Sequence, residues 1–291
     1  IVGNVANLAL NMVFVFGRFG FPAMGAVGSA IASVLARYLM IAVLLVSARH
    51  ELGPMLRPWR AAALDRMALL RMFKIGVPIG LQNSVEFATF ASISICAGWF
   101  GAEAIGGHQV AINLASLTFM VPLGVGSAAS VLVGHAIGEG DLGHARRIAA
   151  SALLCGTGFM LLSACGLLVF PRVFASAYTS VPGVVAVAAA LIPIAGVFQV
   201  FDGLQVVAAG VLRGAGDTRA SLTSNLLGFW LIGMPVSLLL GFRAGLGVVG
   251  LWWGFVAGLA AVAAFLVGRV RVLLSRPVAR VQLESDPARQ V

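Results

Sequence analysis

The stretch VVAVAAALIPIAGVFQVFDGLQVVAAGVLR, residues 184–213, decides the fold of this chain. A helix that crosses a lipid bilayer needs about 20 predominantly apolar residues, and residues 184–212 supply more than that. The stretch contains one acidic residue, Asp202, and no other charge before Arg213. It therefore predicts a membrane-spanning helix that carries a carboxylate inside the hydrocarbon layer.

The rest of the chain has the composition of a membrane protein. Hydrophobic residues make up 60% of its 291 residues, charged residues make up 10%, and the mean hydropathy is +1.02. A soluble chain of this length would need far more polar surface, so the class of soluble proteins is excluded. The three cysteines, Cys96, Cys155 and Cys165, lie in apolar stretches without metal-site spacing, and we interpret them as small buried hydrophobic residues.

Eight apolar stretches are each about long enough to span a bilayer, and they predict an all-α integral membrane protein with eight transmembrane helices. Four prolines fall inside different stretches, where neighbouring helices can satisfy the freed carbonyl groups. These prolines are Pro78, Pro122, Pro193 and Pro235. The stretches lie near residues 1–16, 25–46, 75–100, 105–137, 148–170, 184–212, 221–241 and 247–268. The fourth and the sixth are long enough to extend past the membrane or to bend.

The basic residues predict the orientation of these helices. Of the 19 lysines and arginines, 15 fall in alternate connections and the C-terminal tail, whereas Arg18, Arg172 and Arg243 fall in the other connections. Cytoplasmic connections carry the excess of basic residues, so the larger group and the C-terminus are expected in the cytoplasm. The pI of about 11.1 reflects 19 basic against 10 acidic residues; because the basic residues follow this topology rule, no nucleic-acid partner is expected.

Two acidic residues are predicted at bilayer depth, and the other eight lie in connections or in the tail. Glu86 lies 12 residues after Lys74, and Asp202 lies 11 residues before Arg213. At 1.5 Å per helical residue, both carboxylates are roughly 16–18 Å from the same membrane face. Because a carboxylate in hydrocarbon is costly, we interpret the pair as a cation or proton site in a protein-lined cavity. A salt bridge to Arg37, the one basic residue within a span, is the alternative.

Polar side chains near these acids are spaced along helix faces. Residues at i, i+4 and i+7 share a face, and a spacing of three drifts only slowly around the helix. We interpret them as the lining of a wet cavity, with interhelical hydrogen bonding as the alternative. They are Gln82, Glu86 and Thr89; Gln109, Asn113 and Ser116; and Gln199, Asp202 and Gln205. Asn7 and Asn11, at i and i+4, are predicted instead to face helices that would precede Ile1, with hydrogen bonding between packed helices as the alternative. His108 and His135 lie near helix ends, where we expect interfacial positions.

A repeat divides the chain into segments. MGAVG at 24–28 matches LGVVG at 246–250, each before a long apolar run, at an offset of 222 residues. Parallel repeats are common in transporters, and a six-helix unit would place four further helices before Ile1. The predicted segments are a helical hairpin at 1–46, a cytoplasmic connection at 47–74 with an amphipathic helix at 61–73, a six-helix lobe at 75–274, and a disordered cytoplasmic tail at 275–291.

Local motifs favour structural roles over catalytic ones. Residues 138–143 satisfy GxGxxG but follow a membrane helix, so a dinucleotide site is rejected. The GxGD sequences that end at Asp141 and Asp217 predict turns in which the aspartate caps the next helix. No Walker, GxSxG or HExxH motif is present, so we expect neither an enzyme nor a cofactor. A close-packing helix face is predicted by Gly250, Gly254 and Gly258.

Three segments together resemble the multidrug and toxic-compound extrusion (MATE) family, in its NorM-like branch. They are GVPIGLQNSVEF at 76–87, GGHQVAINLASLTFMVPLGVGSAASVLVGHAIGEGD at 106–141, and FQVFDGLQVVAAGVLRGAGDTR at 198–219. The resemblance implies twelve helices in two lobes around a central cavity, of which this chain would carry the last eight. It also implies antiport of amphiphilic, often cationic drug-like compounds against protons or sodium ions. The expected setting is the bilayer of the bacterial inner membrane, with the protein acting as a monomer.

The resemblance implies roles for single residues. Glu86 matches the acidic residue of the family's seventh helix and Asp202 that of its tenth, the cation-binding pair of the C-terminal lobe. Phe198 stands where some sodium-coupled members have a tyrosine; its lack of an oxygen ligand favours protons and leaves sodium at Glu86 and Asp202 open. The predicted substrate cavity comprises Gln82, Asn83, Thr89, Gln109, Asn113, Phe198, Gln199, Gln205, Asn7 and Asn11.

Other functions remain as alternatives to drug efflux. The two acids of a lipid or polysaccharide-precursor flippase of the same superfamily, or of a membrane enzyme, would contact a head group instead. An inactive fragment is a third interpretation. Dye efflux that depends on a proton or sodium gradient would favour the antiporter.

Overall fold

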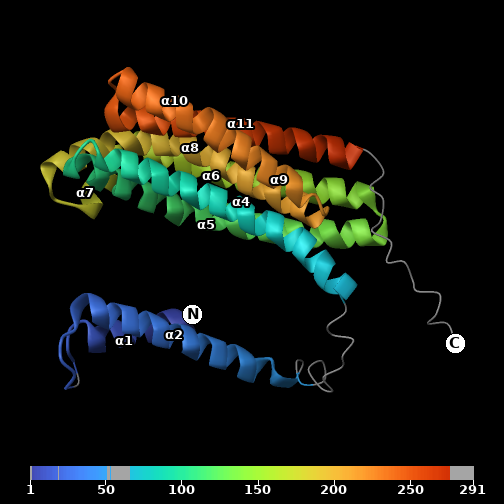
Figure 1. Ribbon diagram of the computed structural model, residues 1–291, viewed down its shortest axis with the longest axis horizontal. Helices are drawn as coiled ribbons and strands as arrows, with labels where there is room; N and C mark the ends of the chain where they lie inside the picture. The colour runs from blue at the N-terminus through green and yellow to red at the C-terminus, as the bar shows by residue number, and fades with distance from the viewer. Residues whose placement is uncertain (1, 19, 51–52, 54–65, 276–291) are drawn as a thin grey trace. The chain divides into compact units, whose positions relative to one another are not determined.

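The computed structural model describes residues 2–18, 20–50, 53 and 66–275, and the regular elements within these ranges are all helical (Figure 1). This confirms the all-α fold class. The longer helices are α1 (Val2–Phe14), α2 (Gly25–Ser47), α4 (Arg66–Gly98), α5 (Ala102–Glu139), α6 (Leu142–Val169), α8 (Pro182–Gly214) and α11 (Gly247–Ser275). The shorter elements are α7 (Pro171–Tyr178), α9 (Thr218–Asn225), α10 (Met234–Leu238), and two π-helical segments, η2 (Leu226–Gly233) and η3 (Leu239–Arg243).

Each of the eight predicted spans lies in a helix. Six helices of the described residues are long and apolar enough to cross a membrane: α2, α5, α6, α8, the continuous helix 218–243, and α11. With 13 residues, α1 is shorter than a span. With 33 residues, α4 is long enough, but Gln82, Asn83 and Glu86 lower its hydropathy. The chain is therefore a multi-pass membrane protein.

The chain forms two compact units, Ile1–Leu70 and Arg71–Val291. In the first unit, α1 and α2 form a hairpin in which Met24 N donates to Phe14 O at 2.9 Å. The segment boundaries at 46, 74 and 274 stay a prediction, because much of the 47–74 connection and residues 276–291 lie outside the described residues. Of the amphipathic helix predicted at 61–73, the described part is continuous with the rest of α4.

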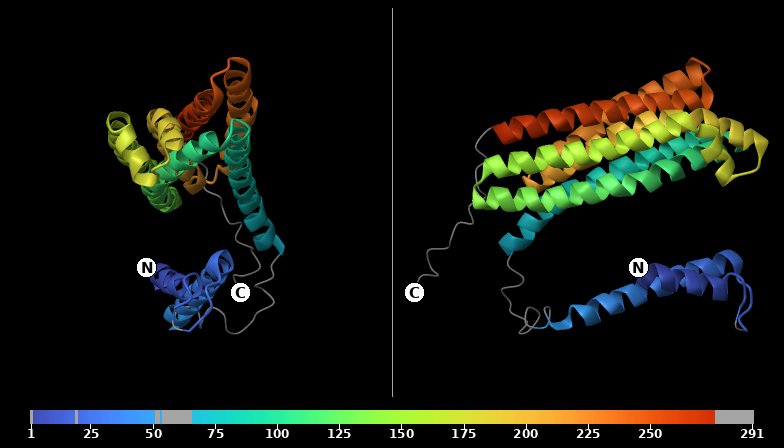
Figure 2. Two further views of the ribbon diagram at one scale, coloured as in Figure 1. Left: turned by 90° about the vertical axis from the view of Figure 1, so that its left-hand side faces the viewer. Right: turned by 180° about the vertical axis from the view of Figure 1, so that it is seen from behind.

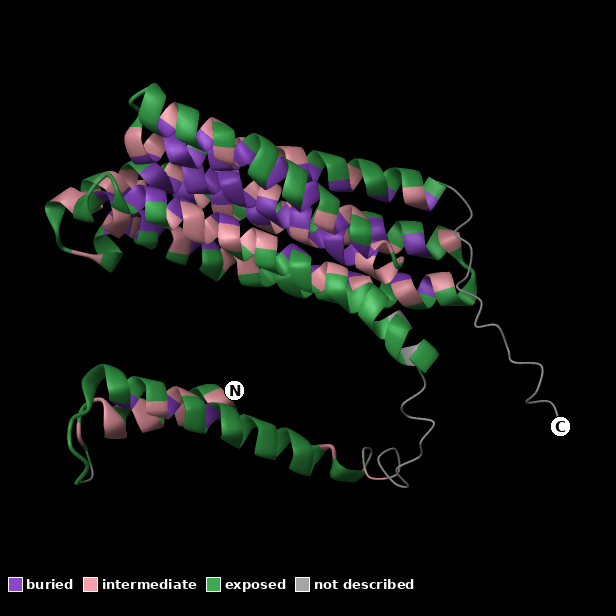
Figure 3. Cartoon of the chain, in the orientation of Figure 1, coloured by how far each residue is buried: buried purple, intermediate pink, exposed green. Residues whose placement is uncertain are grey.

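In the second unit, α8 runs through the centre of an up-and-down helical bundle, in contact with α5, α6 and α11 (Figure 2). The buried residues gather along the middle of this bundle (Figure 3). The parallel pair α5 and α8 meet at Gly126 and Gly210, where an added Cβ would collide with the opposite backbone. Small residues at such crossings let two membrane helices approach closely.

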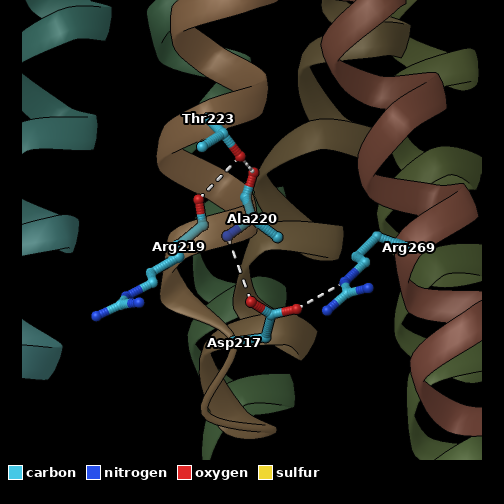
Figure 4. Close-up of polar contacts among 5 residues, drawn as sticks. All are labelled: Asp217, Arg219, Ala220, Thr223 and Arg269. Carbon is cyan, nitrogen blue, oxygen red and sulfur yellow. Dashed lines mark hydrogen bonds and ion pairs between the residues drawn. The ribbon is translucent and has the colours of Figure 1, made fainter.

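The two GxGD turns form as predicted. Gly140 and Gly216 adopt φ values of 83° and 80°, a region that glycine enters at little cost. The Asp141 carboxylate accepts from His144 N at 2.8 Å, and that of Asp217 accepts from Ala220 N at 3.3 Å. Asp217 also pairs with the Arg269 guanidinium at 2.7 Å, which links the start of α9 to α11 (Figure 4). Both aspartates therefore stabilise the start of the following helix, at the arginine-rich end of the bundle.

The predicted glycine row on α11 packs against the helix 218–243. A Cβ added at Gly250, Gly254 or Gly258 would collide with the backbone of that helix. The Ser237 hydroxyl donates to Leu251 O at 2.9 Å across the same contact. The π-helical segments η2 and η3 were not predicted, because an apolar run gives no signal for one hydrogen-bond register over another.

Candidate functional site

The two membrane acids line one cavity of about 300 Å³ between α4, α5 and α8. Glu86 enters it from α4 and Asp202 from α8. The other lining residues are mostly apolar, with Phe90, Phe119 and Phe198 among them. The cavity therefore brings two carboxylates together on largely apolar walls.

The Glu86 carboxylate is held by two amides from different helices. Its Oε2 accepts from Gln205 Nε2 at 3.2 Å and from Asn225 Nδ2 at 3.0 Å. Gln205 lies on α8 and Asn225 ends α9, so this cluster joins α4 to both helices. Hydrogen bonds to a charged acceptor are about twice as strong as those between neutral groups.

Both amides use their nitrogen on Glu86 and leave their oxygen unpaired. Gln205 Oε1 and Asn225 Oδ1 are buried and have no hydrogen-bond partner among the described residues. A buried acceptor without a hydrogen-bond donor costs about 1–3 kcal/mol. A proton or a cation that approached these two oxygens would therefore stabilise the arrangement. Carboxylate and amide oxygens are also the ligands that hard cations take in proteins.

Asp202 is more deeply buried than Glu86 and less well supported. Its exposed fraction is 6%, and no described residue donates a hydrogen bond to its carboxylate. No described basic residue pairs directly with either acid. Because an unpaired buried carboxylate is costly, this pair is suited to gaining a proton or a cation.

A second cavity of about 310 Å³ adjoins the first and shares Glu86, Phe90 and Phe119 with it. Its polar lining comes from four side chains toward the arginine-rich end of the bundle. These are Gln82, Asn83, Gln205 and Arg213. Glu86 therefore stands between an apolar chamber that contains Asp202 and a more polar chamber that ends at an arginine.

An aromatic cluster supports the wall of the first cavity. Phe198 meets Phe90 and Trp252 edge to face, with ring centroids 6.1 and 5.8 Å apart. Phe255 packs on the same rings, 4.8 Å from Phe198 and 4.7 Å from Phe90. Such contacts hold the rings beside the carboxylates in fixed positions.

The structure brings together only some of the predicted cavity residues. The first cavity is shared by Glu86, Ser116, Phe198 and Asp202, while Gln82, Asn83 and Gln205 line the second. Of the other predicted residues, Gln199, Thr89, Gln109 and Asn113 line neither of these two cavities, and Asn7 and Asn11 belong to the first unit.

Each of these six residues takes part in a hydrogen bond to a residue other than Glu86 or Asp202. Gln199 accepts from Thr118 Oγ1 at 2.7 Å and donates to Met160 O at 3.4 Å, which ties α8 to α5 and α6. Thr89 donates to Val85 O within its own helix. Further such bonds join Asn113 Nδ2 to Gln109 O, both residues being exposed, and, in the first unit, Asn7 to Ser33 and Asn11 to Asn7. Arg37 also lies in the first unit, so its pairing with an acid stays untested.

Two residues depart from the sequence-based interpretation. Asn225, which was missed, is the one amide in the predicted span 221–241, and that isolation was the available signal. His108 was expected at an interface, yet it is 1% exposed and its ring meets that of Trp252, with centroids 5.8 Å apart. Its Nδ1 accepts from Trp252 Nε1 at 3.2 Å, and its Nε2 lies 2.8 Å from Ser94 Oγ.

This chain is similar in sequence to known proteins over most of its length. The MatE family model matches residues 78–239. The multidrug resistance protein NorM of Burkholderia vietnamiensis is 38% identical, over 96% of this chain and 61% of its own length. The multidrug resistance protein MdtK of Pectobacterium atrosepticum is 33% identical, over 96% of this chain and 63% of its own length. The chain thus spans about three fifths of the length of these relatives.

Solved structures show the same fold. A eukaryotic MATE transporter, AtDTX14, superposes with a TM-score of 0.82 at 24% identity, over 93% of this chain and 60% of its own. The bent form of the Vibrio cholerae MATE transporter VcmN superposes with a TM-score of 0.77 at 21% identity, over 94% and 61% of the two chains.

Proposed function

This chain belongs to the MatE family, and from that premise we propose that the protein containing it exports drug-like compounds in exchange for protons or sodium ions. The observation that carries the proposal is the pair of carboxylates, Glu86 and Asp202, in one cavity with no basic side chain paired to either among the described residues. The names of its relatives, multidrug resistance proteins, agree with a small amphiphilic substrate. The proposed setting is the bacterial inner membrane, with the C-terminus in the cytoplasm and the protein acting as a monomer.

Exchange follows from the charge of the site. With both carboxylates ionised, their mutual repulsion in an apolar cavity favours the arrival of positive charge. A proton, a sodium ion or a cationic drug each supplies that charge, so binding of one weakens binding of the others by the same factor. Loading the site with the coupling ion on one side of the membrane then releases the drug there.

Gln205 and Asn225 support the binding of either coupling ion, a proton or sodium. With their nitrogens turned to Glu86, as here, they stabilise its ionised form. Rotating either amide would bring its unpaired oxygen toward Glu86, as a ligand for sodium or an acceptor for a carboxyl proton. Phe198 offers no oxygen, which favours protons as the coupling ion.

The test is transport by the protein in proteoliposomes under an imposed proton or sodium gradient. Glu86→Gln and Asp202→Asn should each abolish gradient-driven efflux of a cationic dye, while Glu103→Gln should retain it. Glu103 is exposed at the other end of the bundle, outside both cavities, and serves as the matched acidic control. Wild-type efflux in either cavity variant would overturn the proposal. Gradient-independent movement of a labelled lipid by the unchanged protein would favour the flippase alternative instead.

A further inference from the structure

A third cavity of about 630 Å³ lies outside the transport site, in a groove between α6 and α11. Its walls are apolar and come from both helices, with Ala150, Leu153 and Leu154 on α6 facing Val267 and Val270 on α11. Leu154 is 75% exposed, whereas Val270 at the floor is 4% exposed. The groove therefore opens onto the outer surface of the bundle, which is the surface that faces lipid in a membrane protein.

Arginines stand at one end of this groove. Arg146 and Arg271 line it together with Ser275, and none of the residues that line it is acidic. Arg146 lies in the second turn of α6 and Arg271 in the last turns of α11, so both guanidinium groups are at the level where these helices end. This is also the end of the bundle that carries Arg213 and Arg269.

The two guanidinium groups retain donors for a ligand. Arg146 Nε donates to Leu274 O at 2.5 Å, which fixes its side chain across the groove and leaves its terminal nitrogens available. No described carboxylate pairs with Arg146 or Arg271, whereas Arg269, two residues away on α11, is paired with Asp217. Guanidinium groups in this state match the oxygens of a phosphate ester.

We propose that this groove binds an anionic phospholipid, with its phosphate on Arg146 and Arg271 and an acyl chain along the apolar walls. From Arg146 to Leu154 the groove extends about 12 Å along α6, enough for the upper part of an acyl chain. Basic pockets between membrane helices favour anionic head groups through charge and chain burial together. The ligand bridges α6 and α11, at residues that line neither of the cavities that hold Glu86 and Asp202.

The test measures how many phosphatidylglycerol molecules the purified protein retains, by native mass spectrometry, against phosphatidylcholine with the same acyl chains. The unchanged protein should prefer phosphatidylglycerol. Arg146→Gln and Arg271→Gln should each weaken its binding roughly fivefold, the contribution of one basic residue at an anionic lipid surface. Arg147→Gln is the matched control, because Arg147 is an exposed arginine beside the groove that does not line it.

A second variant separates a lipid in the groove from diffuse attraction to a charged surface. Ala150→Trp keeps both arginines and fills the apolar groove, so it should weaken retention of phosphatidylglycerol as well. An equal loss in Arg147→Gln, or undiminished retention in Ala150→Trp, would overturn the proposal. No described residue forms a bond with the side chain of Arg271, so weaker lipid binding by Arg271→Gln could not be explained by a lost contact within the protein.

Discussion

At the scale of single residues, the properties of the site depend on which atoms of two amides face Glu86. Gln205 and Asn225 direct their nitrogens to one carboxylate oxygen, so the cluster stabilises negative charge at a depth where the membrane disfavours it. Asp202, which lines the same cavity as Glu86, has no such support among the described residues. The two acids therefore differ in environment, and the amides are the reason.

Replacing Asn225 tests this role. Asn225→Ala leaves Glu86 with one amide donor and should change the apparent affinity for the coupling ion roughly tenfold, because a hydrogen bond to a charged group contributes about 1.5–3 kcal/mol. The measurement is the ion-concentration dependence of efflux in proteoliposomes. Thr223→Ala, two residues earlier on α9, is the control, since Thr223 bonds only to the backbone oxygens of Arg219 and Ala220 (Figure 4). An unchanged ion dependence in Asn225→Ala would mean that the contact is dispensable.

His108 provides a second residue-scale prediction. Because Trp252 Nε1 can only donate, His108 Nδ1 is its acceptor, so a neutral ring carries its proton on Nε2 and donates to Ser94. His108→Leu leaves the buried indole N–H unpaired and should destabilise the protein by about 1–3 kcal/mol. His108→Gln, with a donor and an acceptor, should recover part of the loss. Thermal unfolding in detergent checks both, and equal stability of the leucine and glutamine variants would contradict the assignment; exposed His135→Leu is the control.

At the scale of elements, two helix pairs in this bundle are set by close backbone approach, whereas α8 and α11 also meet through large aromatic rings. Gly126 with Gly210 fixes α5 on α8, and the row of glycines on α11 fixes the helix 218–243. This second pairing positions the start of η2 directly after Asn225. A π-helical turn contains one more residue than an α-helical turn, so it rotates the part of the helix that follows. Asn225 therefore lies immediately before a change in the hydrogen-bond register of its helix.

Substitution within the glycine row tests this packing. A Cβ at Gly254 would collide with Ser237, so Gly254→Ala should destabilise the pair by about 1–3 kcal/mol despite the higher helix propensity of alanine. Gly268→Ala is the control on the same helix, because its added Cβ would have no atom within 4 Å. That variant should be neutral or slightly stabilising. Unfolding midpoints of the two proteins in detergent decide, and a Gly254→Ala protein as stable as Gly268→Ala would contradict the packing argument.

At the scale of the whole molecule, charge divides the second unit into two ends. The connections after α5 and α8 and the end of α11 share one end, and the turns around Arg172 and Arg243 share the other. Successive helices run in opposite directions, so their connections alternate between the two ends. A single measurement of which end is cytoplasmic therefore orients every helix of the bundle.

Cysteine accessibility in spheroplasts provides that measurement. Ser180→Cys, at the arginine-poor end, should react with a membrane-impermeant maleimide in intact spheroplasts. Arg219→Cys, at the arginine-rich end, should react only after the membrane is opened, because basic connections stay in the cytoplasm. Both positions are exposed in the structure, so burial does not bias the comparison. The unchanged chain corrects for its native cysteines, because Cys155 and Cys165 are exposed and only Cys96 is buried as predicted. The reverse labelling order would invert the proposed topology.

The sequence alone determined the positions of the helices, the two capped turns and the two acids within apolar helices. These are local properties, because the length of an apolar run, a GxGD turn and the distance of a carboxylate from the nearest charge need no knowledge of neighbours. The family was also readable from the residues 76–87, 106–141 and 198–219.

Only the tertiary structure decided which polar side chains share the cavity. It turned Gln199 toward α5 and α6, brought Asn225 to Glu86 across 139 residues of sequence, and buried His108 against Trp252. The physical reason is that a helix apolar on all sides gives no pattern from which its inward face can be predicted. That face is chosen by contacts between glycines on different helices, which exist only once the bundle has formed.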